Sequence, residues 1–138
     1  MIVLDTNVYL DISADATFAH QVGSMVEESG DEVGLSSVVL GELLVGVKPR
    51  DRARLIAWVT TGIESEGVIT PSHDDWIAAG DALHQLGGGA ATKGRSFWND
   101  LLIASSCVRV GATLVTRNGD DFRRIRRVVP ISVRLRPE

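Results

Sequence analysis

Residues 96–116, SFWNDLLIASSCVRVGATLVT, decide the fold, because they combine a buried helix with a following buried strand. Apolar side chains recur in the first part at intervals of three or four, the spacing of a helix with one packed face. The four positions are Phe97, Leu101, Ala104 and Val108. The run ATLVT at 112–116 is short and apolar, which indicates a strand. A helix leading into such a strand is typical of α/β folds.

The same alternation extends over the rest of the chain. Four further apolar runs have the length of strands, and they lie at 1–5, 33–36, 67–70 and 129–133. Helical spacing is found at 17–29, 37–47, 50–61, 74–86 and 96–109. Ser72 and Asp75 fit a capping box at the start of the fourth of these helices. The pattern predicts an α/β three-layer sandwich with a mostly parallel central sheet of four to five strands.

Length and composition predict one domain spanning 1–138. The chain has 138 residues, 44% of them hydrophobic, which is enough for a single core. It contains no run of eighteen apolar residues, and Asp5 interrupts the apolar N-terminus too early for a signal peptide, so we expect no membrane association. The sole cysteine, Cys107, cannot form an internal disulfide. These features together predict a cytoplasmic protein.

Charge is distributed unevenly along the chain. The net charge is −4, but residues 1–92 contain fourteen acids and four bases, whereas residues 93–138 contain four acids and ten bases. Seven arginines lie after residue 116. A basic segment of this kind attracts phosphate backbones or an acidic protein segment, although it is also compatible with an ordinary solvated surface.

Acidic and polar residues follow two of the predicted strands. Asp5 ends the first strand, and Thr116, Asn118, Asp120 and Asp121 follow the fourth. Ligands of open α/β sheets bind beyond the carboxyl ends of the parallel strands. We therefore expect both groups at the same edge of the sheet.

Glu42 and Asp100 add two carboxylates from predicted helices. Each lies in apolar sequence, one to two turns into a helix expected to begin near that edge. Burial of an unpaired carboxylate costs several kcal/mol, whereas a helix N-terminus offsets only about 0.3–1 kcal/mol. A divalent cation would offset more, and hard oxygen donors favour Mg²⁺, with Mn²⁺ as the alternative.

Each acid also has a purely structural interpretation, as a helix cap, a solvated side chain, a member of an ion pair or a turn residue. Asp5 and Asn7 could cap a helix, and Glu42 could be solvated on a helix rim. Asp100 could pair with Arg95 or Arg117, and Asp120 and Asp121 could be turn residues. Four separate structural explanations are then needed for acids that the fold is expected to bring together. One metal site explains them jointly.

Four segments of the sequence resemble the motifs of PIN domains, and in particular of the small VapC toxins of bacterial toxin–antitoxin pairs. They are LDTN at 4–7, Glu42 in its helix, NDLLIA at 99–104 and TRNGDDF at 116–122. Each motif alone is weak, but the ordered set of four is fairly specific and extends over most of the chain. The resemblance implies a PIN-like fold and a metal-dependent endoribonuclease. It also implies a homodimer, and an antitoxin that inhibits the enzyme.

The resemblance also implies roles for individual residues. Asp5, Glu42 and Asp100 match the three acids that hold the metal. Asp121 matches the fourth acid, although the adjacent Asp120 and the nearby Asn118 compete for that role. Polar positions that support the acids or a bound water are matched by Thr6, Asn7, Asn99 and Thr116.

The implied substrate is RNA, hydrolysed by a metal-activated water. Water as the nucleophile makes the RNA 2′-hydroxyl unnecessary as attacker, and for this family implies a 3′-hydroxyl and a 5′-phosphate at the cut. Candidates for contacts with the RNA backbone are Lys93, Arg95 and Arg117, all of which have solvated surface as an alternative. The first two lie in a glycine-rich segment, 86–96, that we expect to be a mobile basic loop.

Three other functions compete with this one. Residues 89–96, GAATKGRS, come within one residue of the P-loop pattern, but a helix rather than a strand is expected before them. A receiver-type signalling domain needs an acceptor aspartate at the end of the third strand, where GVITPSHDD supplies acids several residues late. A catalytically silent PIN-like protein that only binds a partner is the third, and the intact acids argue against it.

Overall fold

The computed structural model describes residues 1–87 and 94–136. Five strands form one sheet in the order β3-β2-β1-β4-β5, and every adjacent pair is parallel. The strands are β1 (Ile2–Leu4), β2 (Val33–Ser36), β3 (Val68–Ile69), β4 (Thr113–Thr116) and β5 (Ser132–Leu135). All five therefore end at the same edge of the sheet, as the expected site requires.

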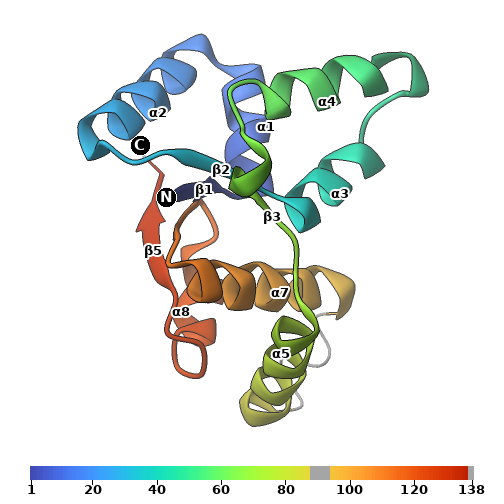
Figure 1. Ribbon diagram of the computed structural model, residues 1–138, viewed down its shortest axis with the longest axis vertical. Coiled ribbons are helices and arrows are strands. Elements are labelled where there is room, and N and C mark those ends of the chain that lie inside the picture. Colours follow the sequence, from blue (N-terminus) through green and yellow to red (C-terminus); the bar gives the residue numbers. More distant parts are fainter. Residues whose placement is uncertain (88–93, 137–138) are drawn as a thin grey trace.

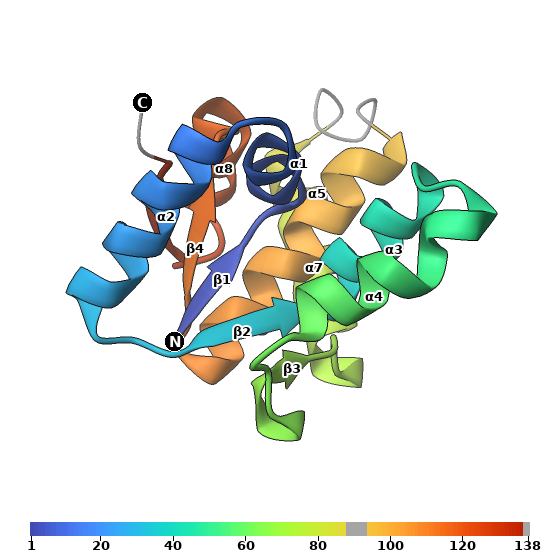
Figure 2. The same cartoon turned by 90° about the horizontal axis from the view of Figure 1, so that it is seen from above.

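Helices cover both faces of the sheet (Figure 1). Helices α1 (Thr6–Ala14), α2 (Ala16–Ser29) and α4 (Arg52–Thr60) lie on one side, and α5 (His73–Leu86), α7 (Gly94–Val110) and α8 (Gly119–Ile125) lie on the other. Helix α3 (Ser37–Val45) follows β2 and contacts both α1 and α7. The view from above shows β1, β2 and β4 running between these helices (Figure 2). Short 3₁₀ turns, η1 (Pro49–Asp51) and η2 (Ser65–Gly67), complete the connections.

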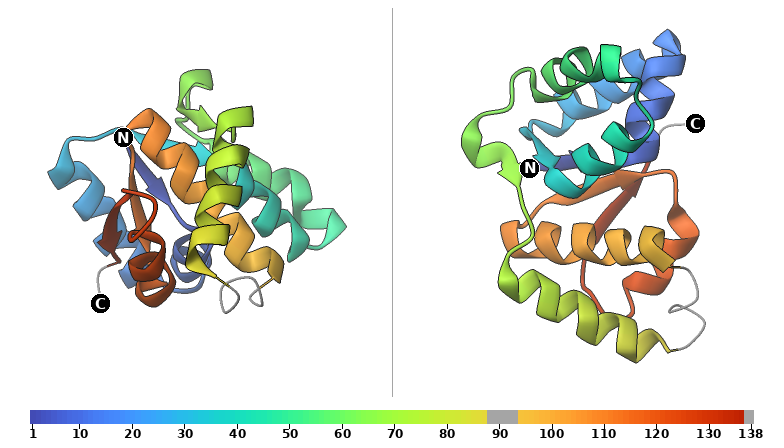
Figure 3. Two further views of the ribbon diagram at one scale, coloured as in Figure 1. Left: turned by 90° about the horizontal axis from the view of Figure 1, so that it is seen from below. Right: turned by 90° about the vertical axis from the view of Figure 1, so that its right-hand side faces the viewer.

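The core is centred on α7, which lies between the sheet and α5 (Figure 3). Phe97, Leu101 and Ile103 are at most 1% exposed, so this helix is buried well beyond a single stripe. Residues 100–107 are all buried, which explains why mostly small or apolar side chains fill the middle of the helix. Asp100 is therefore carried into the interior by the residues that bury the helix around it.

The predicted α/β class and the parallel sheet are confirmed. The capping box at α5 is present as well, because the Ser72 hydroxyl accepts from the backbone N–H of Asp75 while the Asp75 carboxylate accepts from the backbone N–H of Ser72. Within the described residues, 1–87 and 94–136, no helix is long and apolar enough to cross a membrane.

Three predictions about elements were wrong or incomplete. The helices Thr6–Ala14 and Gly119–Ile125 were not predicted, and the last strand is Ser132–Leu135 instead of 129–133. The apolar run VPISV begins as a buried turn because Val129 and Ile131 pack into the core before the strand starts. Most of the predicted mobile loop 86–96, Lys93 included, lies outside the described residues.

Burial of Cys107 in α7 gives a testable pH dependence. The side chain is 0% exposed, and desolvation, with smaller contributions from Asp5 and Asp75, raises the pKa of its thiol from 9.0 to about 12. The thiol therefore ionises in the unfolded chain before it ionises in the folded one. Above pH 9 the free energy of unfolding should fall as pH rises, by up to about 1.4 kcal/mol per pH unit from this group, until about pH 12.

Chemical unfolding of wild type and Cys107→Ala between pH 8 and 11 measures this contribution. The variant has lower stability at pH 8 because of the cavity, but a shallower decline at higher pH. The decline does not vanish, since burial also raises the pKa of Tyr9, from 10.0 to about 12. Parallel curves for the two proteins would show that Cys107 contributes nothing to the pH dependence.

Candidate acidic active site

Asp5 directly follows β1 and is the N-cap of α1. Its backbone N–H donates to the Val115 carbonyl at 2.9 Å, because β1 and β4 end side by side. The side chain is only 3% exposed. Its Oδ1 accepts from the backbone N–H of Thr6 at 2.8 Å. Its Oδ2 accepts from Thr116 Oγ1 at 2.7 Å and from Asn7 Nδ2 at 3.2 Å. These contacts fix the orientation of the carboxylate.

Glu42 reaches the same edge from α3. That helix begins immediately after β2, with Ser36 as its N-cap, so its first two turns lie beyond the carboxyl end of the sheet. The Thr6 hydroxyl donates to Glu42 Oε1 at 2.8 Å, while the Thr6 backbone N–H donates to Asp5. Thr6 therefore links two carboxylates that are 37 positions apart in the sequence.

Asp100 and Asp121 are linked by Asn118. Asp100, in the second turn of α7, is 6% exposed, and its Oδ2 lies 3.5 Å from Asn118 Nδ2. The same amide nitrogen donates to Asp121 Oδ2 at 3.1 Å. The Asn118 backbone N–H donates to the Thr116 hydroxyl, which itself donates to Asp5. One hydrogen-bonded network therefore contains all four acids.

Asp120 points away from this network. Its side chain is 93% exposed and forms an ion pair with Arg123 at 2.8 Å. Both acids belong to α8, and adjacent residues on a helix project about 100° apart, so only one of them can face Asn118. The structure brings Asp121 to the other carboxylates and leaves Asp120 in solvent.

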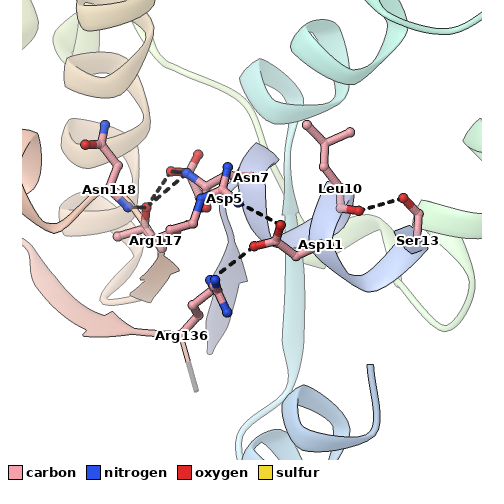
Figure 4. A network of polar contacts seen from close by, with 9 residues as sticks. Asp5, Asn7, Leu10, Asp11, Ser13, Arg117, Asn118 and Arg136 are labelled. Atoms are coloured by element: carbon pink, nitrogen blue, oxygen red, sulfur yellow. Dashed lines mark hydrogen bonds and ion pairs between the residues drawn. The ribbon is translucent and has the colours of Figure 1, made fainter. Parts of the chain in front are cut away.

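The remaining candidates occupy the rim. Asn99 is half-buried and lines a groove of about 560 Å³ together with Glu42 and Arg95. Arg117 forms an ion pair with Asp11 of α1 at 2.7 Å, and its backbone N–H donates to the Asn7 side-chain oxygen. Figure 4 shows these contacts beside Asp5. Asp11 was not among the predicted site residues, because the helix that contains it, α1, was not predicted.

Burial makes a negative charge at Asp5 costly. Desolvation raises the pKa of Asp5 above its ordinary value of 3.8, and the hydrogen bonds from Thr116, Thr6 and Asn7 only partly oppose this. Within residues 1–87 and 94–136, no three acidic, histidine or cysteine side chains converge tightly enough to form a ready-made metal cage. The acids are instead spaced by the hydroxyl and amide groups that join them.

The family follows from the sequence as a whole: the model of the PIN domain matches residues 2–128. The chain belongs to the PIN domain family. PIN domains of toxins are in general nucleases. No curated protein matches the chain.

Solved structures share the fold of this PIN domain. A chain in VapBC2 from Rickettsia felis bound to promoter DNA has a TM-score of 0.70 and 24% identity, with 98% of each chain covered. A chain in DNA-bound VapBC from Salmonella typhimurium has a TM-score of 0.68 and 20% identity, covering 99% of this chain and 98% of the other. A chain in a toxin–antitoxin complex from Klebsiella pneumoniae has a TM-score of 0.65 and 20% identity, covering 88% and 90% respectively.

The donor set of this PIN domain fits a divalent cation. All four acids offer hard oxygen ligands, and the desolvated Asp5 carboxylate gains from a positive charge. Mg²⁺ usually retains several waters and takes only one or two carboxylates directly, so a tight cage of three is not required. The residues that would hold such an ion are therefore Asp5, Glu42, Asp100 and Asp121, and the bound ion would supply the positive charge that the site lacks.

A substitution at Asn118 tests whether the four acids need a positive charge to compensate their own. Asn118→Asp would replace the amide between Asp100 and Asp121 by a third carboxylate. We expect the free energy of unfolding in EDTA at pH 7 to fall by about 1–3 kcal/mol, because two hydrogen bonds become like-charge contacts. Millimolar Mg²⁺ should restore stability through linkage. Urea unfolding with and without metal measures both effects, and a loss that Mg²⁺ leaves unchanged would contradict the expectation.

The two rival nucleotide or phosphate sites are not supported by this fold. The P-loop-like segment 89–96 follows α5, whereas a P-loop follows a strand. The third strand, β3, ends at Ile69 and is followed by Thr70 and Pro71, so an acceptor aspartate is lacking there.

Proposed function

We propose that this PIN domain is a metal-dependent endoribonuclease of the VapC type, the toxin of a toxin–antitoxin pair that acts in the cytoplasm. The proposal rests on the network in which Asp5, Glu42, Asp100 and Asp121 meet at the carboxyl edge of the sheet. It is supported by the family and by the toxin–antitoxin complexes with the same fold.

The chemistry assigned to the site is hydrolysis of an RNA phosphodiester. A bound Mg²⁺ or Mn²⁺ would lower the pKa of a water and neutralise charge that develops on the phosphate. Asp5, Glu42, Asp100 and Asp121 are the residues proposed to hold the ion. Thr6, Asn7, Thr116 and Asn118 orient these carboxylates through the hydrogen bonds already described.

The RNA backbone is proposed to lie along the groove between α3 and α7. Arg95 is exposed in the first turn of α7, and it lines this groove with Asn99 and Glu42. A phosphate held by Arg95 would lie beside the acids. Two further contacts with the RNA backbone are proposed, Lys93 and Arg117. Lys93 lies outside the described residues, and Arg117 is paired with Asp11.

Incubation of purified protein with total RNA tests the function. We expect cleavage with Mg²⁺ or Mn²⁺, none with EDTA, and products with 5′-phosphate and 3′-hydroxyl ends. Products with cyclic phosphates, or cleavage that survives EDTA, would rule out metal-activated water. Binding of a partner without any cleavage would instead indicate the catalytically silent alternative.

An antitoxin segment is proposed to bind the groove between α1, α3 and α4. This groove, about 590 Å³, has apolar walls that include Leu10, Leu43 and Trp58, and both Thr6 and Glu42 line it. An amphipathic helix seated there would reach the acids at its end, where a basic side chain would meet them. The groove and the acidic site are therefore continuous.

Leu10 tests this partner site, since its side chain is 53% exposed in the groove. Leu10→Glu should weaken binding of the antitoxin by about 100-fold, because a charge replaces an apolar contact, and inhibition should weaken in parallel. The proposed function predicts a small reading frame next to the gene, and its protein product is the ligand to titrate by calorimetry. Unchanged affinity would place the partner elsewhere.

A homodimer is proposed to form through α3 and α5. Val45, Trp76 and Ile77 are 77%, 49% and 50% exposed, which is unusual for large apolar side chains. Val45 and Trp76 also line the groove that holds Glu42 and Asn99. A second copy on this face would lie beside the acidic site.

A further inference from the structure

Asp11 holds two arginines that come from distant parts of the chain. Its Oδ1 accepts from Arg117 Nη1 at 2.7 Å, and its Oδ2 forms an ion pair with Arg136 Nε at 3.1 Å, whose geometry is not that of a hydrogen bond. Arg117 follows β4 and Arg136 follows β5, whereas Asp11 belongs to α1. Figure 4 shows the carboxylate between the two side chains. We call these three residues the Asp11 clamp.

One side of the Asp11 clamp acts on the loop that carries Asn118. Arg117 lies between Thr116 and Asn118, both of which belong to the acidic network. Its backbone N–H donates to the Asn7 side-chain oxygen at 3.0 Å, while its guanidinium is bound by Asp11. The loop is therefore held on its inner side by the acids and on its outer side by the Asp11 clamp.

The other side of the Asp11 clamp acts through β5. The Arg136 backbone N–H donates to the Thr116 carbonyl at 3.0 Å, which continues the pairing of β5 with β4. The Arg136 guanidinium carbon lies 4.7 Å from the centre of the Phe18 ring in α2. Arg136 is 29% exposed by side chain and Asp11 22%, so these contacts are shielded better than those of a surface ion pair.

We propose that Asp11 is a positioning residue for the acidic site. Through Arg117 and Arg136 it fixes the β4–α8 loop, and so keeps the Asn118 amide between Asp100 and Asp121. It touches none of the four acids itself. The inference rests on the proposed function, because what it positions is the proposed nuclease site.

Two variants with opposite charge changes separate positioning from electrostatics. Asp11→Asn removes a negative charge and Arg136→Gln removes a positive one, but both break the Asp11 clamp. We expect each to lower kcat for RNA about tenfold, the range typical of groups that orient ligands of a metal, with KM changed less than twofold in Arg136→Gln. If Asp11 acted only through its field, kcat would move in opposite directions in the two variants, and the inference would be wrong.

Asp31→Asn is the matched control for the change of acid to amide. Asp31 pairs with the N-terminal amine at 3.6 Å and lies before β2, at the opposite edge of the sheet. It should retain the kcat and KM of wild type. Thermal unfolding of all three variants identifies any loss that comes from unfolding, and Arg136→Gln decides the question if Asp11→Asn does not fold.

Hydrogen exchange at Asn118 tests the Asp11 clamp without any reaction. In ¹⁵N spectra, we expect the Asn118 side-chain amide and backbone N–H to exchange at least fivefold faster in Asp11→Asn and Arg136→Gln, and as in wild type in Asp31→Asn. Faster exchange in a protein that does not cleave RNA would support the Asp11 clamp and reject the proposed function. If the wild-type enzyme is active and both clamp variants keep wild-type exchange at Asn118 and wild-type kcat, the Asp11 clamp is rejected while the proposed function stands.

Discussion

Asp5→Asn is expected to reduce the rate of RNA cleavage by about 10³-fold, equivalent to roughly 4 kcal/mol of transition-state stabilisation. The substitution removes the charge of the most deeply buried of the four acids while it preserves the size of the side chain. Its effect on stability should be small. An amide cannot accept all three hydrogen bonds made to Asp5, but it also removes a charge that burial disfavours.

Two variants at adjacent acids, Asp121→Asn and Asp120→Asn, test whether the loss of activity is specific to the acids of the network. The first should lose activity by at least tenfold, because Asp121 contacts Asn118, and the second should stay within twofold of wild type, because Asp120 is exposed and pairs with Arg123. Single-turnover cleavage at saturating Mg²⁺ measures these rates. Equal losses in both variants would mean that the general charge of this region matters, and not the orientation of one carboxylate.

Trp76→Glu is expected to convert a dimer into a monomer. Trp76 packs against Trp98 with ring centres 5.8 Å apart, yet it is 49% exposed, so its outer surface is available to a second copy. A charge at the centre of such an interface weakens association by about 100-fold or more. Sedimentation velocity at micromolar concentration separates the two states.

Trp58→Glu is the matched control for this change. Trp58 is similarly exposed, at 41%, but it packs against Tyr9 on the side of α1 and α4. Its substitution should leave the dimer intact. A wild-type protein that sediments as a monomer would refute the proposed interface, and dissociation by both variants would point to a different contact.

The fold was predictable wherever the apolar pattern was strong. The spacing of Phe97, Leu101 and Ala104 indicated α7 because these side chains are buried in the core, whereas Val108, at the next position of the same spacing, is 38% exposed. The short helix α8 was missed because Asn118 and Gly119 are strong turn residues, and only packing of Phe122 and Ile125 in the core makes the following residues helical. The start of β5 depends on pairing with β4, which no local pattern specifies.

The sequence predicted which strands and helices would carry the candidate site, but not which side chains would contact one another. The strand-end rule indicated that Asp5 and the residues after β4 would meet, and the hydrogen bond from Thr116 to Asp5 shows how closely they do. The choice between Asp120 and Asp121 required the phase of α8, and the bridge formed by Thr6 required the angle between α1 and α3. Both are set by tertiary packing.

Binding of Mn²⁺ tests the central claim, that the four carboxylates share a divalent cation, most directly. Electron paramagnetic resonance counts free Mn²⁺ during a titration of wild type, Asp5→Asn, Asp100→Asn and Asp31→Asn. The claim predicts at least one bound ion in wild type and Asp31→Asn, with affinity at least tenfold weaker in both site variants. Equal affinity in all four proteins, or no bound ion in wild type, would contradict it.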